Sequence, residues 1–289
     1  MNRSTKTLLT AAAAAAFFAS AGAASAQSGM WGYTPDTWTG PYVGAFGGFT
    51  QQNGEGNETI RFDRNLDGNY GDPVLLAGAA RADAFSPGFC DGNAANAVAA
   101  SGCDEDAGGT QGGIRAGYDY QLGSFVVGGV VDYSFVNQED SVTGFSTTPA
   151  YYTFTRTLQQ LAAVRARLGY AYGPALAYVT GGHATGELDN SYITSNGANS
   201  FRASIDDDKA DGYQLGGGVE YALAPNLSLT GEYLYTSLDA GDYVIRTGAG
   251  TAPATNPFIL APFTTGTDQI RSNSRFGMHG FNLGMSYRF

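Results

Sequence analysis

The sequence predicts an all-β protein, an eight-stranded antiparallel transmembrane up-and-down β-barrel. Its 42 Gly, 18 Tyr and 17 Phe, with only 14% charged residues, favour short strands over helices. Several segments alternate apolar and polar side chains with a period of two, the pattern of a strand with two different faces. Tight turns and long connections join these segments alternately, which is the layout of an outer-membrane barrel with both termini in the periplasm.

The first residues predict export. Arg3 and Lys6 precede an apolar run at residues 8–18, and Ala26 ends a small-residue site before Gln27. This order is typical of a secretory signal peptide. A transmembrane helix is the alternative, but the run is mostly alanine and is followed at once by Gly and Ser. We therefore expect a signal peptide at residues 1–26, a periplasmic lead at 27–40, and a barrel with four long surface loops at 41–289.

The charge balance disfavours one class of partner. Without Arg3 and Lys6 the chain has 13 basic against 26 acidic residues, a formal net charge of −13. Such acidity makes nucleic acid an unsuitable partner.

The clearest hairpin lies in the middle of the chain. Residues 113–121, GIRAGYDYQ, place Tyr118 on one face and Arg115 on the other. A short turn at 122–124 leads into residues 125–135, which alternate in the same way. The two segments predict a β-hairpin.

The same unit recurs, so that eight strands are expected in all. They are residues 42–51, 113–121, 125–135, 158–172, 175–185, 212–221, 227–235 and 276–289. The long connections are residues 52–111, 137–151, 186–211 and 237–274. Period-two residues at 59–62 leave open whether the first connection adds further strands.

The two faces of these strands differ in polarity. The apolar face carries Ile114, Tyr118, Val131, Val164, Leu168, Leu215, Val219, Leu229, Phe281, Leu283 and Met285. The other face carries Arg115, Asp119, Asp132, Arg165, Arg167, Glu220, Glu232 and Arg288. In a water-soluble sandwich the apolar face would be the core, so alternation alone leaves that fold open.

Aromatic side chains favour the barrel, because they are expected in two groups on the apolar face. Near the tight turns lie Tyr42, Tyr120, Phe125, Tyr170, Tyr172, Tyr221, Tyr287 and Phe289. Near the long connections lie Tyr133, Phe135, Tyr152, Tyr213, Tyr233 and Tyr235. Two aromatic girdles that flank an aliphatic band match a membrane-spanning barrel.

The sequence ends inside a strand, FNLGMSYRF. Phe281 and Phe289 are expected to face lipid, and Arg288 to face inward. This strand must pair with the first one, near residues 42–49, so that no edge is left exposed in the bilayer. Closure of the barrel therefore accounts for a strand with no further turn.

Three segments resemble a known family: WTGPYVGAFGGF, RARLGYAYGPALAYVTGG and the terminal Tyr287-Arg288-Phe289. They are similar to the small outer-membrane β-barrel family of opacity-type surface proteins and alphaproteobacterial outer-membrane antigens, often called the porin family. The resemblance covers the strands and fails in the loops. It implies that the barrel-assembly machinery reads Tyr287 and Phe289 as an assembly signal. The long first loop departs from the family, so no surface function follows from the resemblance.

The eight inward charges have two interpretations. Four arginines meet four acids, which sum to zero, and an eight-stranded barrel is only wide enough for side chains to fill it. Because buried charges must be paired, one interpretation is a neutral interior ion-pair network. The other is a narrow gated pore.

Cys90 and Cys103 are the only cysteines, and both lie in one polar connection. In an oxidising compartment they are expected to form a disulfide that restrains this connection. A metal site would need more ligands nearby.

One segment partly matches a calcium loop. In DRNLDGNYGD, Asp63, Asn65 and Asp67 fit its start, but Val74 stands at the twelfth position, where a bidentate acid is required. Acidic, glycine-rich surface loops are usually just solvated. We expect no metal and no cofactor.

Some small outer-membrane barrels hydrolyse or transfer lipid or peptide with a histidine beside Ser, Asp or Glu. Here only His183 and His279 exist. His183 is expected on the inward face near the top of its strand, and His279 on the lipid face near the upper girdle. No G-x-S-x-G, phosphate-loop or zinc motif appears, so we expect no enzyme. A lipid-modifying activity stays open as a third class because two histidines are present.

The expected role is structural and interactive. The barrel would lie among outer-membrane lipid and lipopolysaccharide and would present acidic loops at the cell surface, for envelope integrity or for contact with a host or surface ligand. The alternative is a low-conductance channel for small solutes.

Overall fold

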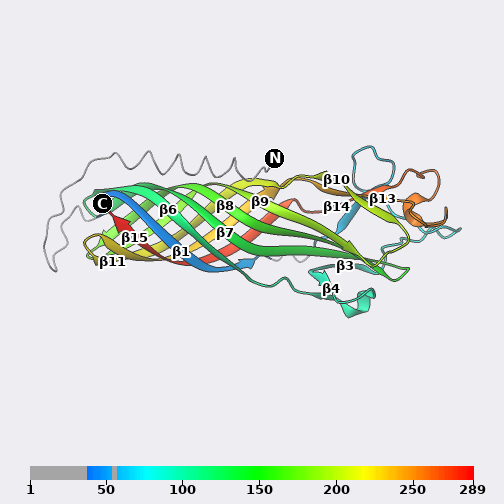
Figure 1. Cartoon of the computed structure of the whole chain (residues 1–289), viewed down its shortest axis with the longest axis horizontal. Helices are drawn as coiled ribbons and strands as arrows, with labels where there is room; N and C mark the ends of the chain where they lie inside the picture. The colour runs from blue at the N-terminus through cyan, green and yellow to red at the C-terminus, as the bar shows by residue number, and fades with distance from the viewer. Residues whose placement is uncertain (1–37, 54–56) are drawn as a thin grey trace, which may run out of the picture.

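The computed structural model describes residues 38–53 and 57–289, so the predicted signal peptide and most of the predicted periplasmic lead lie outside the described residues. In this part of the chain eight strands form a closed antiparallel ring (Figure 1). They are β1 (Gly40–Gln52), β6 (Gly109–Leu122), β7 (Phe125–Ser146), β8 (Ala150–Tyr172), β9 (Ala175–Thr194), β11 (Lys209–Ala224), β12 (Leu227–Ala240) and β15 (Arg275–Arg288). The predicted eight-stranded barrel is confirmed.

The ring closes between its first and last strands. β1 pairs with β15 from Tyr42 opposite Arg288 to Gln52 opposite Met278, and with β6 on its other edge. Closure leaves neither strand with an unpaired edge, as a bilayer requires. β1 begins at Gly40, inside the segment predicted as the lead.

Side chains alternate between lipid and lumen as the two-residue period predicts. On the outside, Ile114 is 65% exposed and Leu283 is 68% exposed. Every one of the eight predicted inward charges is buried. Apart from Tyr42 and Tyr152, the predicted girdle residues are exposed or half-exposed on the outer face.

Tyr42 and Tyr152 were assigned to the wrong face. Each is only 2% exposed. Tyr42 points into the lumen beside Gly117, where an added Cβ would lie 2.5 Å from the tyrosine ring, so the glycine provides the room for it. Tyr152 lies near the far end of β8 and packs in an apolar core beyond the membrane.

The predicted long connection at 137–151 is wrong. β7, β8 and β9 are 22, 23 and 20 residues long, whereas a membrane-spanning strand needs about 9–11. The β7–β8 ladder continues to Ser146 opposite Ala150, which leaves only residues 147–149 as a turn. Ten extra residues at about 3.3 Å each carry these strands roughly 30 Å further along their own direction.

The other long connections fold as well, and together with the far ends of β7, β8 and β9 they form what we call the head. Its strands are β2 (Ile60–Asp63), β3 (Gly88–Asp91), β4 (Asn93–Ala94), β5 (Cys103–Asp104), β10 (Ser200–Asp206), β13 (Tyr243–Gly248) and β14 (Thr267–Arg271). Two 3-10 turns, η1 (Ala99–Ser101) and η2 (Pro257–Ile259), complete it. β10, β13, β14 and β2 form a four-stranded sheet, while β3 extends the barrel sheet beside β7. The period-two residues at 59–62 thus largely coincide with a real strand, β2.

The head has its own apolar core. Ile60 and Phe62 of β2 pack with Val142 of β7, Phe154 of β8 and Ile245 of β13. The predicted disulfide between Cys90 and Cys103 is confirmed, with Cα atoms 6.1 Å apart. The predicted surface loops are therefore largely a folded body, stabilised by burial of apolar surface and by a covalent link.

Two neighbouring glycines of β1 give a test of the closing seam. An added Cβ at Gly48 would lie 2.0 Å from the Phe281 carbonyl oxygen, whereas at Gly47 its nearest contact is 3.8 Å away. Gly48→Ala should lower the free energy of unfolding by about 1–3 kcal/mol, since β15 must move. Gly47→Ala should change it by no more than about 0.5 kcal/mol. Urea unfolding of the refolded barrel in lipid vesicles measures both, and equal midpoints would contradict the seam described here.

Candidate functional site

The lower lumen holds two neutral groups of ion pairs. In the upper group, Arg115 Nη2 lies 2.8 Å from Glu232 Oε2, and Arg115 Nε lies 3.2 Å from Asp132 Oδ1, an ion-pair contact not aligned as a hydrogen bond. Arg165 pairs with the same Asp132 and, at 3.4 Å, with Glu232. Tyr178 Oη donates a hydrogen bond of 2.9 Å to Glu232. Two cations and two anions from four strands thus neutralise one another.

The lower group repeats this balance nearer the tight turns. Arg167 lies 3.2 Å from Asp119 and also pairs with Glu220. Arg288 approaches Asp119 to 2.9 Å and Glu220 to 3.6 Å. The guanidinium of Arg288 lies 4.9 Å from the Tyr42 ring centre, a cation–π distance. Thus the structure brings together all eight charges that the sequence placed inside.

Apolar side chains close the lumen on both sides of these pairs. At the tight-turn end Trp38 packs with Val126 and Leu176, and its carbonyl oxygen accepts a hydrogen bond of 2.7 Å from Arg288. On the other side lies an apolar cluster that includes Leu161 and Phe276. Between charges and apolar cluster a cavity of about 10 Å³ remains, room for about one water molecule.

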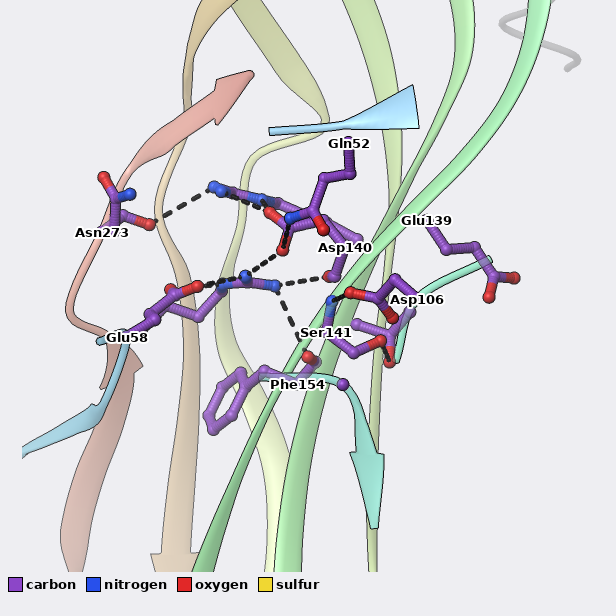
Figure 2. Close-up of polar contacts among 12 residues, drawn as sticks. Gln52, Glu58, Asp106, Glu139, Asp140, Ser141, Phe154 and Asn273 are labelled. Atoms are coloured by element: carbon purple, nitrogen blue, oxygen red, sulfur yellow. Dashed lines mark hydrogen bonds and ion pairs between the residues drawn. The ribbon is translucent and has the colours of Figure 1, made fainter. Parts of the chain in front are cut away.

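Above the apolar cluster lies a second ion-pair network, which we call the neck and which sequence reasoning missed (Figure 2). The guanidinium of Arg271, on β14, donates two hydrogen bonds to the Glu58 carboxylate, of 2.8 and 2.6 Å. It also donates to Asp140, at 2.9 Å to Oδ1 and at 2.7 Å to the backbone carbonyl oxygen. Arg156 of β8 donates to Asp140 Oδ2 at 2.6 Å and to the Ser274 carbonyl oxygen at 3.0 Å. The neck therefore ties the head sheet to two ring strands.

Electrostatics in the neck favours charged Asp140. Burial alone would raise the pKa of this carboxyl, but the guanidinium groups of Arg271 and Arg156 outweigh it and hold the pKa below its ordinary value. Nearby Asp106 has no such direct cation, and burial raises its pKa, although it accepts a hydrogen bond of 2.7 Å from the Ser141 amide. Asp140 is thus the anion on which the neck depends.

The calcium candidates do not form an open metal site. Asp63 is buried, and its carboxylate accepts hydrogen bonds from the backbone amides of Leu66 at 2.6 Å and Gly68 at 2.8 Å. Asn65 donates to Asp67 at 3.0 Å. These groups shape the turn after β2, and among the described residues no cluster of three His, Cys, Asp or Glu side chains is placed to hold a metal ion.

The histidines lie on the outer face. His279 is half-exposed beside Tyr233, whose hydroxyl lies 2.7 Å from its Nδ1. His183, predicted to point inward, points outward with 65% of its side chain exposed, 3.5 Å from exposed Asp211. Its position was predicted wrongly because β9 carries apolar residues on both faces, such as Leu176 inside and Val179 outside.

The two terminal aromatic residues, Tyr287 and Phe289, are exposed on the outer face with ring centres 5.1 Å apart. The Phe289 amide donates a hydrogen bond of 3.0 Å to the Pro41 carbonyl oxygen.

Across the described residues no helix has the length and apolar character needed to span a bilayer.

A lipid-facing ring with a filled, charge-paired lumen defines the class of protein, an outer-membrane β-barrel. Residues 9–289 match the family model described as outer membrane protein beta-barrel domain, and the chain belongs to that family. Its place is the outer membrane, as predicted.

Two sets of relatives support this placement. The chain is 32% identical over 191 residues to the 31 kDa outer-membrane immunogenic proteins of Brucella melitensis and Brucella suis, covering 64% of this chain and 69% of each relative. It is 30% identical over 149 residues to the 22 kDa outer membrane protein of Rhizobium leguminosarum bv. viciae, covering 51% of this chain and 62% of the relative. Among solved structures it is similar to OprG from Pseudomonas aeruginosa, with a TM-score of 0.45 at 10% identity, covering 88% of this chain and 99% of that one.

Arg165 tests the charge pairing in the lumen. Arg165→Met leaves Asp132 and Glu232 buried with Arg115 as their single arginine partner in the upper group, which should lower the free energy of unfolding by about 3–5 kcal/mol. Arg202→Met, which changes an exposed arginine of the head, should cost no more than about 0.5 kcal/mol. Urea midpoints of the refolded proteins compare the two, and an unchanged midpoint for Arg165→Met would contradict the network.

Asp140 gives the neck a pH dependence. Because its folded pKa lies below the ordinary value of 3.8, its stabilisation is present above that pH and is lost as the pH falls through the folded pKa. Asp140→Asn should therefore weaken the neck by about 3–5 kcal/mol at pH 7 and by less at pH 3. Hydrogen exchange of the β14 amides measures it, with Asp208→Asn, an exposed acid, as control. A cost that is the same at both pH values would exclude this role of the ionised carboxylate.

Proposed function

We propose that the protein is a non-conducting, non-catalytic surface protein whose barrel anchors a folded acidic head outside the cell for contact with a surface ligand. The observation that carries this proposal is the filled lumen. Trp38, two groups of ion pairs, an apolar cluster and the neck follow one another along its axis, and the cavity between the upper ion pairs and the apolar cluster measures about 10 Å³. A continuous solute path would require several of these layers to open together.

The head supports a role in contact rather than transport. It has its own apolar core, a four-stranded sheet and a disulfide, and the neck joins it to the ring. A body fixed in this way presents one constant surface, which lowers the entropy cost of binding a partner.

The charge of the head indicates the chemistry of that partner. Among the described residues, seven arginines form ion pairs with seven acids in the lumen, the neck and the head, so the net negative charge of this part of the chain rests on the remaining groups. Exposed acids on the head and at the upper ends of ring strands are Asp67, Asp83, Asp104, Glu105, Glu139, Asp189, Asp206, Asp207, Asp208, Asp211, Asp239 and Asp242. A cationic or neutral ligand fits this surface, and an anionic one is repelled.

Residues on the outer face of the barrel support the proposed contacts with the barrel-assembly machinery, lipid and lipopolysaccharide. Tyr287 and Phe289 are accessible on the last strand, where the barrel-assembly machinery would read them. The aromatic girdles suit the interfaces with outer-membrane lipid and lipopolysaccharide. His183 and His279 lie on the same outer face, one beside Asp211 and one beside Tyr233, and neither lines the lumen cavity.

One experiment with two measurements tests this function. Residues 27–289, refolded into planar bilayers, should give no steady single-channel openings, whereas openings that change in Arg165→Met would establish a pore instead.

On intact cells an amine-reactive, membrane-impermeant label should reach Lys209, which is the one lysine of the chain besides Lys6. Lys209 is exposed at the head end of β11. Lys209→Arg is the matched control for background labelling, and labelling of Lys209 only after cell lysis would refute surface exposure.

A further inference from the structure

A pocket of about 260 Å³ opens at the far end of the head, away from the lumen. Four connections surround it. They are the β7–β8 turn at residues 146–150, the β9–β10 connection at 195–198, the β13–β14 connection at 256–258, and Leu76, Ala84 and Phe85 from the connection between β2 and β3. These segments are far apart in sequence and meet at the end of the molecule opposite the tight turns (Figure 1).

Three aromatic side chains form the inner wall of this pocket. The ring centres of Phe85, Tyr152 and Phe258 lie 5.2, 5.6 and 5.9 Å from one another, and each side chain is 2–3% exposed. All three belong to the apolar core of the head, so they are held in place without a ligand. The apolar base of the pocket is thus preformed, and it suits an apolar ligand.

The polar groups of the rim are uncharged, and its asparagine side chains are joined by hydrogen bonds. The side-chain amide of Asn196 donates at 3.0 Å both to Tyr152 Oη and to Asn199 Oδ1. Asn256 Nδ2 donates to the same Asn199 oxygen at 2.9 Å. Among the described residues that line the pocket there is no Asp, Glu, Lys, Arg or His. A charged ligand would therefore lose its hydration without gaining an ionic partner.

We propose that this pocket binds a small, neutral, mainly apolar molecule with one or two rings, entering from the end of the head. The volume exceeds the ~150 Å³ of a dry apolar cavity that accepts benzene, and it lies just below the ~300 Å³ at which pockets for drug-sized ligands begin. The accessible lining of the pocket is more apolar than polar, so water there has few hydrogen-bond partners and its displacement by an apolar ring favours binding. The acidic surface around the head further disfavours anions.

Binding of indole tests this proposal on residues 27–289 refolded into lipid nanodiscs, which contain no free detergent to fill the pocket. Equilibrium dialysis of radiolabelled indole against protein nanodiscs and empty nanodiscs should show saturable binding of one indole per protein. Indole-3-carboxylate, a similar ring with a negative charge, should bind at least tenfold more weakly. Either the absence of saturable indole binding or equal binding of the anion would overturn the proposal.

Two glycines provide a matched pair of variants. An added side chain at Gly197, on the pocket rim, or at Gly71, outside the pocket, meets no atom within 4 Å at its Cβ, so both proteins should fold. Gly197→Trp should fill the entrance and weaken indole binding at least tenfold, while Gly71→Trp should stay within twofold of the parent chain. Heat-modifiable mobility on gels confirms that both barrels are folded. Equal indole binding by the two folded variants would place the indole elsewhere and overturn the proposal.

Discussion

The narrow interior of an eight-stranded ring is the constraint on which the rest of the structure depends. Backbone groups in the hydrocarbon region have no water to bond, so the sheet must close, here through β1 and β15. A ring of eight leaves only enough space for side chains. Inward residues must therefore satisfy one another, and four arginines with four acids do so in two groups of zero net charge.

The same requirement continues beyond the membrane. Because β7, β8 and β9 run on past the bilayer, their inner faces still need partners, and the folded connections supply them. The neck is where lumen and head meet: Arg271 from β14 and Arg156 from β8 share Asp140 of β7. Such a pair of guanidinium groups around one buried carboxylate is stable only as a set, so the head cannot tilt freely without leaving a buried charge unpaired.

Inward and outward side chains were predicted correctly where the two faces of a strand differ sharply in polarity, as on β6, and wrongly where that contrast is weak. β1 has aromatic residues on both faces, and its register is set by closure with β15 rather than by a turn, so nothing local could place Tyr42. His183 lies on β9, where that contrast is also weak, but there the adjoining turn offered a local constraint. The two-residue turn at Gly173-Pro174 fixes the β8–β9 register, which puts His183 opposite lipid-facing Val164, and counting from the turn would have placed it outside.

The missed ends of β7 and β8 have a physical cause of their own. Register shifts lie between Phe135 and Gln138 and between Leu158 and Gln160, at the height where the ring leaves the membrane. A bulge breaks the two-residue period, so in sequence it looks like the end of a strand. Beyond it the outside is water and head rather than lipid, and the apolar pattern no longer marks one face. The neck was out of reach for another reason, since Glu58 and Arg271 are 213 residues apart and neither lies in a predicted strand.

The distribution of arginines along the barrel also bears on how far the head stands from the membrane. Half of the described arginines lie in the lumen and the neck, where an unpaired carboxylate would be costly, so the exposed surface of the head is left strongly acidic. Anionic groups at a membrane surface repel such a body within about a Debye length, roughly 8 Å at physiological salt. Strands that continue some 30 Å along their own direction beyond the length needed to cross the bilayer carry the far end of the head out of that range, whereas its lowest acids, such as Asp211, stay near the girdle. Repulsion and strand length therefore act in the same direction on the far end of the head.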